Sequence, residues 1–198
     1  MKLKNQRRFP TDDMVLEDKN FNDVLYCLLQ VESNHTPGEK HRYVKKSLVD
    51  KKSWAKLMSM SVKTFNRRLK DLIDKNVIIE QEDYYILPEE ISKYYYMIPV
   101  DTMRFLCNTA NQDVFKVYSY LGRWYENEGS NAYFTKSKLI TVLGGKSTTN
   151  PRDWEKINDI LTCLKNNGLI EYIAEYEPGK KNRIARYKIV KVNKTYKK

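Results

Sequence analysis

One pattern of apolar residues occurs twice in this chain, with the second copy 92 positions after the first. In each copy, apolar side chains recur at i, i+3, i+7 and i+10, a spacing that lines one face of a helix. An Asn or a Gly follows, and both suit the left-handed residue that ends many helices. The two sets are Val62, Phe65, Leu69 and Leu72 before Asn76, and Trp154, Ile157, Leu161 and Leu164 before Gly168.

The residues around the repeat predict the same neighbours for both helices. A shorter helix precedes each copy, and two strands separated by a polar turn follow it. Ser61, Thr135 and Asn150 are expected to cap helices. The predicted helices lie at 50–58, 62–75, 136–143 and 151–167, and the strands at 78–80, 84–87, 170–176 and 183–192. Helix, turn, helix and β-hairpin is the outline of a winged helix, so we expect an α+β fold of two tandem winged-helix domains.

A short connector divides the predicted chain. With 198 residues, the chain is long enough for two small domains, each with its own core. We expect a first winged-helix domain at residues 11–87 and a second at residues 94–192, joined by a linker at residues 88–93. Residues 1–10 are predicted to be a flexible basic arm, and residues 193–198 a basic tail.

Positive charge is concentrated in the second half of the chain. The net charge is +11; residues 1–99 hold 18 basic and 15 acidic side chains, whereas residues 100–198 hold 18 and 10. Residues 178–198 contain nine Lys or Arg and no Asp or Glu. A solvated tail that aids solubility is one explanation, but such asymmetry favours a surface that faces a polyanion. Nucleic acid is therefore the expected partner.

The helix predicted at 62–75 carries the first candidate DNA-binding residues. Its polar face holds Lys63, Thr64, Asn66, Arg67 and Lys70, with Arg68 at the edge. In a helix-turn-helix protein, the second helix enters the major groove with its first turns. Arg can bind guanine and Asn can bind adenine there, while Lys and Thr can hold phosphates. The alternative is that this is the solvated basic face of an ordinary helix.

The corresponding helix of the second copy is more acidic. Asp153, Glu155 and Asp159 would repel phosphates, so we expect contacts at its N-terminus and in the loop before it. The candidate DNA-binding residues there are Lys146, Ser147, Thr148, Arg152 and Lys156. An alternative is that the acidic face binds a protein.

The second hairpin is the better candidate for a phosphate-binding wing. Basic side chains lie at its predicted tip and continue along one strand: Lys180, Lys181, Arg183, Arg186 and Lys188. Such a wing can follow the phosphate backbone or enter the minor groove. An exposed basic edge strand that limits aggregation is the alternative. The first hairpin is short and acidic, and is a poor phosphate binder.

No catalytic or metal-binding pattern stands out in the sequence. Residues 144–148 resemble the end of a phosphate-binding loop, but Ile140 occupies the position where that loop needs its first glycine. The cysteines are widely spaced, which predicts buried, reduced thiols: Cys27, Cys107 and Cys163. The histidines, His35 and His41, are not clustered with them, so no metal site is expected. No apolar run is long enough to span a membrane. We expect a cytoplasmic protein without enzymatic activity, cofactor or metal.

Two stretches resemble winged-helix replication initiators of plasmids and phages. Lys-Tyr-Tyr-Tyr-Met-Ile-Pro-Val at 93–100, followed by Phe-Lys-Val-Tyr-Ser-Tyr-Leu at 115–121, is similar to the strand-Ile-Pro-helix opening of initiator domains. Leu-Thr-Cys-Leu-Lys-Asn-Asn-Gly-Leu-Ile at 161–170 resembles a junction between recognition helix and wing. The resemblance implies a protein that binds repeated or palindromic DNA near an origin and recruits host replication proteins. The acidic second helix departs from the pattern, which leaves open whether both domains contact DNA.

The expected function is thus double-stranded DNA binding, with initiation of plasmid or phage replication as the first role considered. A transcriptional regulator of a mobile element has the same expected architecture and remains an alternative. A second alternative is a winged-helix module that binds and inhibits a host nucleic-acid machine. Host replication proteins and a second copy of the chain are further partners that the sequence leaves open.

Overall fold

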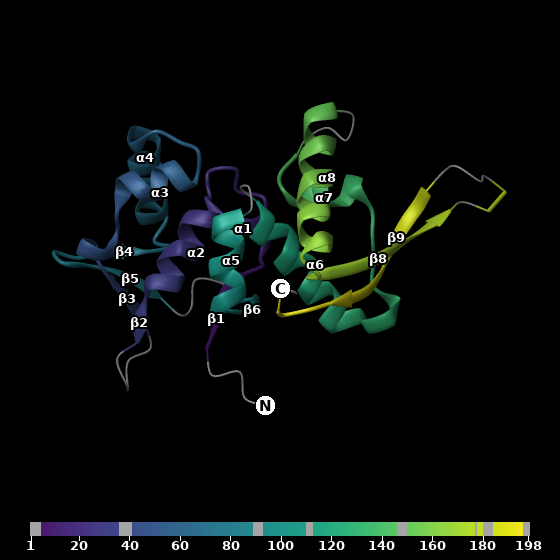
Figure 1. Ribbon diagram of the computed structural model, residues 1–198, viewed down its shortest axis with the longest axis horizontal. Coiled ribbons are helices and arrows are strands. Elements are labelled where there is room, and N and C mark those ends of the chain that lie inside the picture. The colour runs from purple at the N-terminus through teal and green to yellow at the C-terminus, as the bar shows by residue number, and fades with distance from the viewer. Residues whose placement is uncertain are drawn as a thin grey trace.

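The computed structural model describes residues 5–35, 41–88, 93–109, 113–145, 150–176, 178–179 and 184–195 (Figure 1). The fold is α+β, as predicted, with helices around three small antiparallel sheets. The first half contains β1 (Gln6–Pro10), α1 (Asp13–Leu16), α2 (Asp23–Glu32), β2 (Asn34–His35), β3 (His41–Lys45), the 3-10 helix η1 (Lys46–Leu48), α3 (Lys51–Leu57), α4 (Val62–Asp74), β4 (Ile79–Glu80) and β5 (Tyr84–Pro88).

The second half has nearly the same order of elements. It contains β6 (Tyr95–Pro99), α5 (Val100–Thr109), α6 (Val114–Glu128), the 3-10 helix η2 (Gly129–Asn131), β7 (Tyr133–Phe134), α7 (Lys136–Val142), α8 (Pro151–Asn166), β8 (Ile170–Tyr176) and β9 (Ile184–Val192). The strand order β3-β5-β4 in one sheet corresponds to β7-β9-β8 in the other. The duplication thus extends beyond the helix and hairpin of the sequence repeat to the strand and helices before them.

Side-chain caps begin the helices where the sequence predicts them. Ser61 Oγ accepts the backbone N–H of Thr64 at 3.1 Å, and Thr135 Oγ1 accepts that of Lys138 at the same distance. The Asn150 side chain accepts the N–H of Arg152, also at 3.1 Å, with Pro151 in the first turn. Each cap satisfies an N–H group that would otherwise have no partner in the first turn.

The prediction of a flexible arm at residues 1–10 is wrong for its second half. Gln6–Pro10 forms β1 and pairs antiparallel with β6, so that Phe9 lies opposite Tyr96. Phe9 is fully buried, and its ring stacks against Phe115 with 6.0 Å between centroids. Burial of this ring and the backbone hydrogen bonds of the ladder together hold the strand in place.

The described part of the predicted basic tail, residues 193–195, is also anchored. Asn193 donates from its backbone N–H to Leu169 O at 2.8 Å and from its side chain to Gly168 O at 2.7 Å. Lys194 forms an ion pair with Glu126 at 2.8 Å. The chain therefore stays attached to the second unit beyond β9 at these positions.

The two halves share one hydrophobic core, whereas the sequence suggested two separate ones. Helix α2 packs against α5 and α6 of the second half and is buried from Asp23 to Val31. An aromatic cluster continues this contact: Phe9 packs against Phe21 and Tyr26 of its own half and stacks on Phe115 of the second. The predicted linker lies largely at residues 89–92, which are outside the described residues.

Candidate nucleic-acid interface

Helices α3 and α4 form a helix-turn-helix unit on the upper side of the molecule as drawn in Figure 1. Between them, Ser59 adopts a left-handed conformation with φ 51°, which reverses the chain within a few residues. Helix α4 buries Phe65, Leu69 and Leu72 against the core. Because these three side chains line one face, the basic face of α4 is directed outward.

The predicted site residues on α4 differ in how far they are already engaged. Lys63, Asn66 and Arg67 are exposed, and their side chains form no ion pair or hydrogen bond with any residue that the structure describes. Thr64 Oγ1 lies 3.0 Å from Ser61 Oγ, within the cap of the helix. The three exposed polar groups near the start of α4 are therefore open to a ligand.

Arg68 and Lys70 have partners inside the protein. Arg68 donates to the side-chain oxygen of Asn20 at 3.0 Å and lies 3.6 Å from the Asp71 carboxylate. Lys70 lies 3.3 Å from Asp74, and both side chains are largely exposed. An exposed ion pair one helical turn apart is worth only about 0.3–0.5 kcal/mol, so Lys70 can exchange Asp74 for a phosphate. Arg68 instead attaches α4 to the loop before α2.

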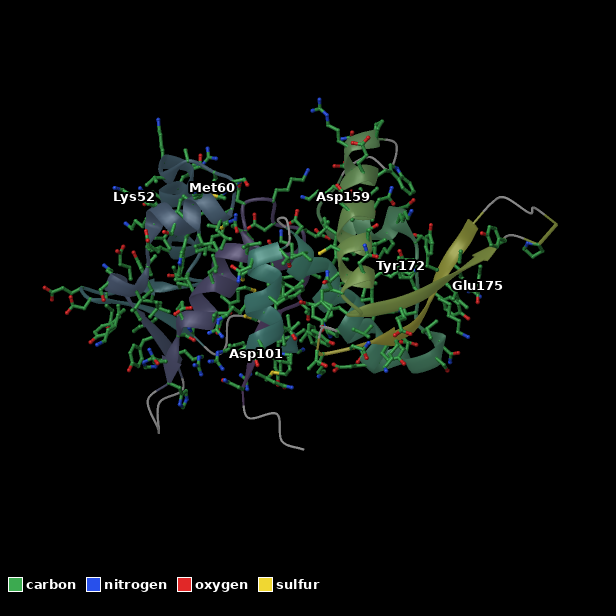
Figure 2. All side chains as sticks on the ribbon, viewed as in Figure 1. Lys52, Met60, Asp101, Asp159, Tyr172 and Glu175 are labelled. Atoms are coloured by element: carbon green, nitrogen blue, oxygen red, sulfur yellow. The ribbon has the colours of Figure 1, made fainter. Side chains whose placement is uncertain are left out.

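Helix α3 carries a basic group that the sequence reasoning missed. Lys51, Lys52 and Lys56 are exposed and have no ion-pair partner among the described residues; Lys52 is labelled in Figure 2. Asp50 caps this helix by accepting the N–H groups of Lys52 and Ser53 at 3.0 and 3.1 Å. In helix-turn-helix proteins, the first helix crosses the DNA backbone. Three lysines in a seven-residue helix directly before α4 were the available signal.

Helix α8 occupies the corresponding place in the second unit and presents a mixed surface. It buries Ile157, Ile160, Leu161 and Leu164, and it exposes Glu155, Asn158 and Asp159, the last labelled in Figure 2. Arg152 is exposed at its first turn. The predicted contacts Lys146, Ser147 and Thr148 lie outside the described residues.

The second hairpin, β8 and β9, extends away from the body of the molecule (Figure 1). Arg186 forms an ion pair with Glu175 at 2.8 Å, and its guanidinium lies 3.7 Å from the centre of the Tyr133 ring. Lys188 lies near the same ring, at 5.9 Å. Glu175 therefore compensates part of the positive charge on this hairpin. The predicted tip residues Lys180, Lys181 and Arg183 lie outside the described residues.

A polar network connects α4 to α8 through the contact between the two halves. Lys75, at the end of α4, forms an ion pair with Asp18, whose backbone oxygen accepts from Lys116 Nζ at 2.8 Å. Lys116 Nζ lies 3.0 Å from Asp113 Oδ1, in ion-pair contact without hydrogen-bond geometry. Asp113 also forms an ion pair with Lys156 of α8. Lys156, a predicted DNA contact, is thus used within the protein.

Asp23 adds a buried carboxylate to this network. It accepts the backbone N–H groups of Asp113 and Phe115, each at 2.9 Å, and so caps the start of α6. The pKa of Asp23 is raised to about 6, mainly because the carboxyl group is buried. The negative charge of Asp113 also raises this pKa, and its effect is larger than the opposite effect of the positive charge of Lys116. The network therefore helps to orient the two units, although burial and the nearby Asp113 disfavour the charged form of Asp23.

In the part of the chain that the structure describes, no group of three or more His, Cys, Asp or Glu residues is placed to hold a metal ion. Burial raises the pKa of the thiols of Cys27, Cys107 and Cys163, which form no disulfide. Within the same residues, no helix has both the length and the apolar character needed to cross a membrane.

Comparisons with models of protein families, with curated proteins and with solved structures found no match. Function is therefore inferred from the surfaces themselves. The most distinctive of these is the outward face of α3 and α4, where exposed lysines surround an exposed Asn and Arg.

Proposed function

We propose that this protein binds double-stranded DNA through two tandem winged-helix units, with α4 as the principal recognition helix. One observation carries the proposal: α4 buries Phe65, Leu69 and Leu72 and holds Lys63, Asn66 and Arg67 exposed at its start, without partners among the described residues. These residue types, at the beginning of the second helix of a helix-turn-helix, match those that contact base edges and phosphates in the major groove.

The residues divide into those that would read bases and those that would hold the backbone. Arg67 is the candidate for guanine, where its guanidinium can bind O6 and N7, and Asn66 is the candidate for adenine. Lys63 and the lysines of α3 have the length and charge to contact phosphates on either side of the groove. Arg68 acts differently, because its bond to Asn20 fixes the position of α4 itself.

The second unit would add contacts along the same duplex. Helices α4 and α8 both lie on the upper side of the molecule in Figure 1, and the network from Lys75 to Lys156 holds them in one orientation. Arg152 at the start of α8 and Lys188 on the wing are its described cationic candidates. Glu155 and Asp159 make α8 a weaker phosphate binder than α4.

Initiation of replication on a plasmid or phage is the role that we propose, on the strength of the resemblance of residues 93–100, 115–121 and 161–170. A regulator of transcription would use the same surfaces. Selection of bound fragments from randomised and native DNA at physiological salt, followed by sequencing, tests both. Enrichment of repeated copies of one motif would support an initiator, and a single palindrome a regulator. Absence of any enriched motif would contradict sequence-specific DNA binding.

Acidic surfaces favour a second candidate, a protein-interaction module. Glu155 and Asp159 are exposed on α8, and Glu80, Glu82 and Asp83 surround the first hairpin. Charge reversal of Lys63, Arg67 and Lys70 to Glu separates the two functions. Loss of DNA binding is expected from the proposed function, whereas a protein-interaction module would retain its partner.

A further inference from the structure

A small pocket is lined by residues of β1. In Figure 1, β1 lies on the side of the molecule away from α4 and α8. Its volume is about 90 Å³, and three arginines from two strands line it: Arg7, Arg8 and Arg42. Gln30 of α2 and Tyr95 of β6 form further parts of its wall. A cavity of this size is several times the volume that one water molecule requires, so that a larger ligand group can enter.

Arg7 is the unusual member of this group. It is only 9% exposed, and all its hydrogen-bond acceptors are neutral: Nε donates to Gln30 O at 3.1 Å, and Nη1 donates to Asn5 Oδ1 and Gln6 O, each at 3.2 Å. No carboxylate among the described residues forms an ion pair with it. A buried charge that lacks a counter-ion costs several kcal/mol, and proteins rarely leave one unpaired.

Two neighbours increase the positive charge and are held in place. Arg42 donates from Nε to Ser33 Oγ at 2.6 Å and from Nη2 to Ser33 O at 2.7 Å. The guanidinium of Arg8 lies 4.7 Å from the centre of the Tyr95 ring. Burial, followed by the positive charge of Arg42, lowers the pKa of Arg7 to about 10. Hydrogen bonds and a ring contact thus hold three guanidinium groups around the pocket.

We propose that this pocket binds a phosphate group through Arg7, with Arg8 and Arg42 at its sides. A guanidinium N–H group forms a short, charge-assisted hydrogen bond with a phosphate oxygen, and the bound anion would compensate the buried charge. Nε and Nη1 of Arg7 already donate to oxygen atoms of the protein, so Nη2 is the nitrogen that can donate to the ligand. The site is separate from α4 and α8, so it does not depend on the proposed DNA binding.

Thermal unfolding of the full chain tests the site directly. Inorganic phosphate is added to the protein with chloride as the control at equal ionic strength, and Tm is measured. At roughly a hundredfold excess over Kd, phosphate should raise Tm by about 5–10 °C more than chloride does. Equal shifts in the two salts would overturn the proposal. A nucleoside monophosphate is the second ligand: a larger shift assigns the site to a nucleotide phosphate, and an equal shift to phosphate itself.

Variants separate this pocket from the basic surface of α4. Arg7→Gln should lose the phosphate-specific shift and keep or raise its Tm in chloride, because the uncompensated charge is gone. Arg8→Gln, at an exposed position, is the second variant in case Arg7→Gln does not fold, and should at least halve the shift. Arg104→Gln on α5 and the pair Lys63→Gln and Arg67→Gln are controls that should retain it. An undiminished shift in both Arg7→Gln and Arg8→Gln would overturn the assignment.

Discussion

The carboxylate of Asp23 accepts the backbone N–H groups of Asp113 and Phe115, each at 2.9 Å, across the contact between the two halves of the chain. Asp23 is the first residue of α2, and Phe115 lies in the first turn of α6. One unit thus caps a helix of the other. These two hydrogen bonds join the halves in addition to the shared hydrophobic core. They help to fix the position of one unit relative to the other.

Replacing Asp23 with Ala should therefore destabilise the whole chain. The buried N–H groups of Val24, Asp113 and Phe115 lose their acceptor, for which we expect a loss of about 2–4 kcal/mol in the free energy of unfolding. The two halves should also unfold less cooperatively, so that urea transitions followed by circular dichroism and by tryptophan fluorescence separate. Asp101→Ala is the matched control, since its side chain is 86% exposed (Figure 2). Equal stability of the two variants would contradict the role of Asp23.

The raised pKa of Asp23 predicts a dependence of stability on pH. Its pKa is about 6 in the folded protein and about 3.9 in an unfolded chain, so the native state binds more protons between these values. The contribution of Asp23 to stability is therefore largest below about pH 4 and falls as the pH rises to about 6. The difference in unfolding free energy between wild type and Asp23→Asn, measured by urea titration, should increase as the pH is lowered. Parallel pH profiles would refute this assignment.

Replacing Lys156 should lower the stability of the protein and leave the salt dependence of DNA binding unchanged. Its ammonium forms an ion pair with Asp113, and Lys156→Met leaves that buried carboxylate with Lys116 as its remaining cation. Because Lys156 is half-exposed, we expect a loss of only about 1–2 kcal/mol. Lys138→Met on α7 is the control for stability. The slope of log affinity against log salt should not change in Lys156→Met; a slope smaller by about one would identify Lys156 as a phosphate contact.

The lysines of α3 are predicted to contact phosphates. Changing Lys51, Lys52 and Lys56 to Gln should weaken binding to all DNA sequences alike and reduce the salt slope by about 0.9 for each phosphate that is no longer neutralised. Fluorescence anisotropy with two unrelated duplexes measures both effects. Arg104→Gln, which removes one charge from α5, should bind as the wild type does. Binding of the triple variant with an unchanged slope would exclude α3 from the interface.

Local signals explain why the helices were predicted well. The side-chain caps of Ser61, Thr135 and Asn150 act within three residues of the chain, and the apolar spacing of α4 and α8 reports burial of one face. Helix α2 is apolar at every position from Val24 to Val31 except Gln30, a sign of complete burial that would have indicated a shared core. The pairing of β1 with β6 joins residues some 90 positions apart, and a short Arg-rich strand gives no local sign of its partner.

The candidate site was predictable in part for the same reason. The outward face of α4 follows from helical spacing, and Lys63, Asn66 and Arg67 are exposed as expected. Arg68 and Lys156 are engaged with partners 48 and 43 residues away, which no spacing rule reveals. Whether a basic side chain is open to a ligand therefore depends on tertiary contacts that composition does not record.

The most direct test of DNA recognition by α4 is a salt titration of DNA binding by wild type, by the pair Lys63→Gln and Arg67→Gln, and by the control Arg104→Gln. Anisotropy of a labelled duplex from the selection gives the affinity. If six to ten phosphates are neutralised, wild-type affinity should fall by about 10³–10⁵ between roughly 50 and 200 mM salt. The paired variant should bind more weakly and with a smaller slope, while Arg104→Gln follows the wild type. Salt-independent binding, or equal affinity of the paired variant and wild type, would contradict recognition of DNA by α4.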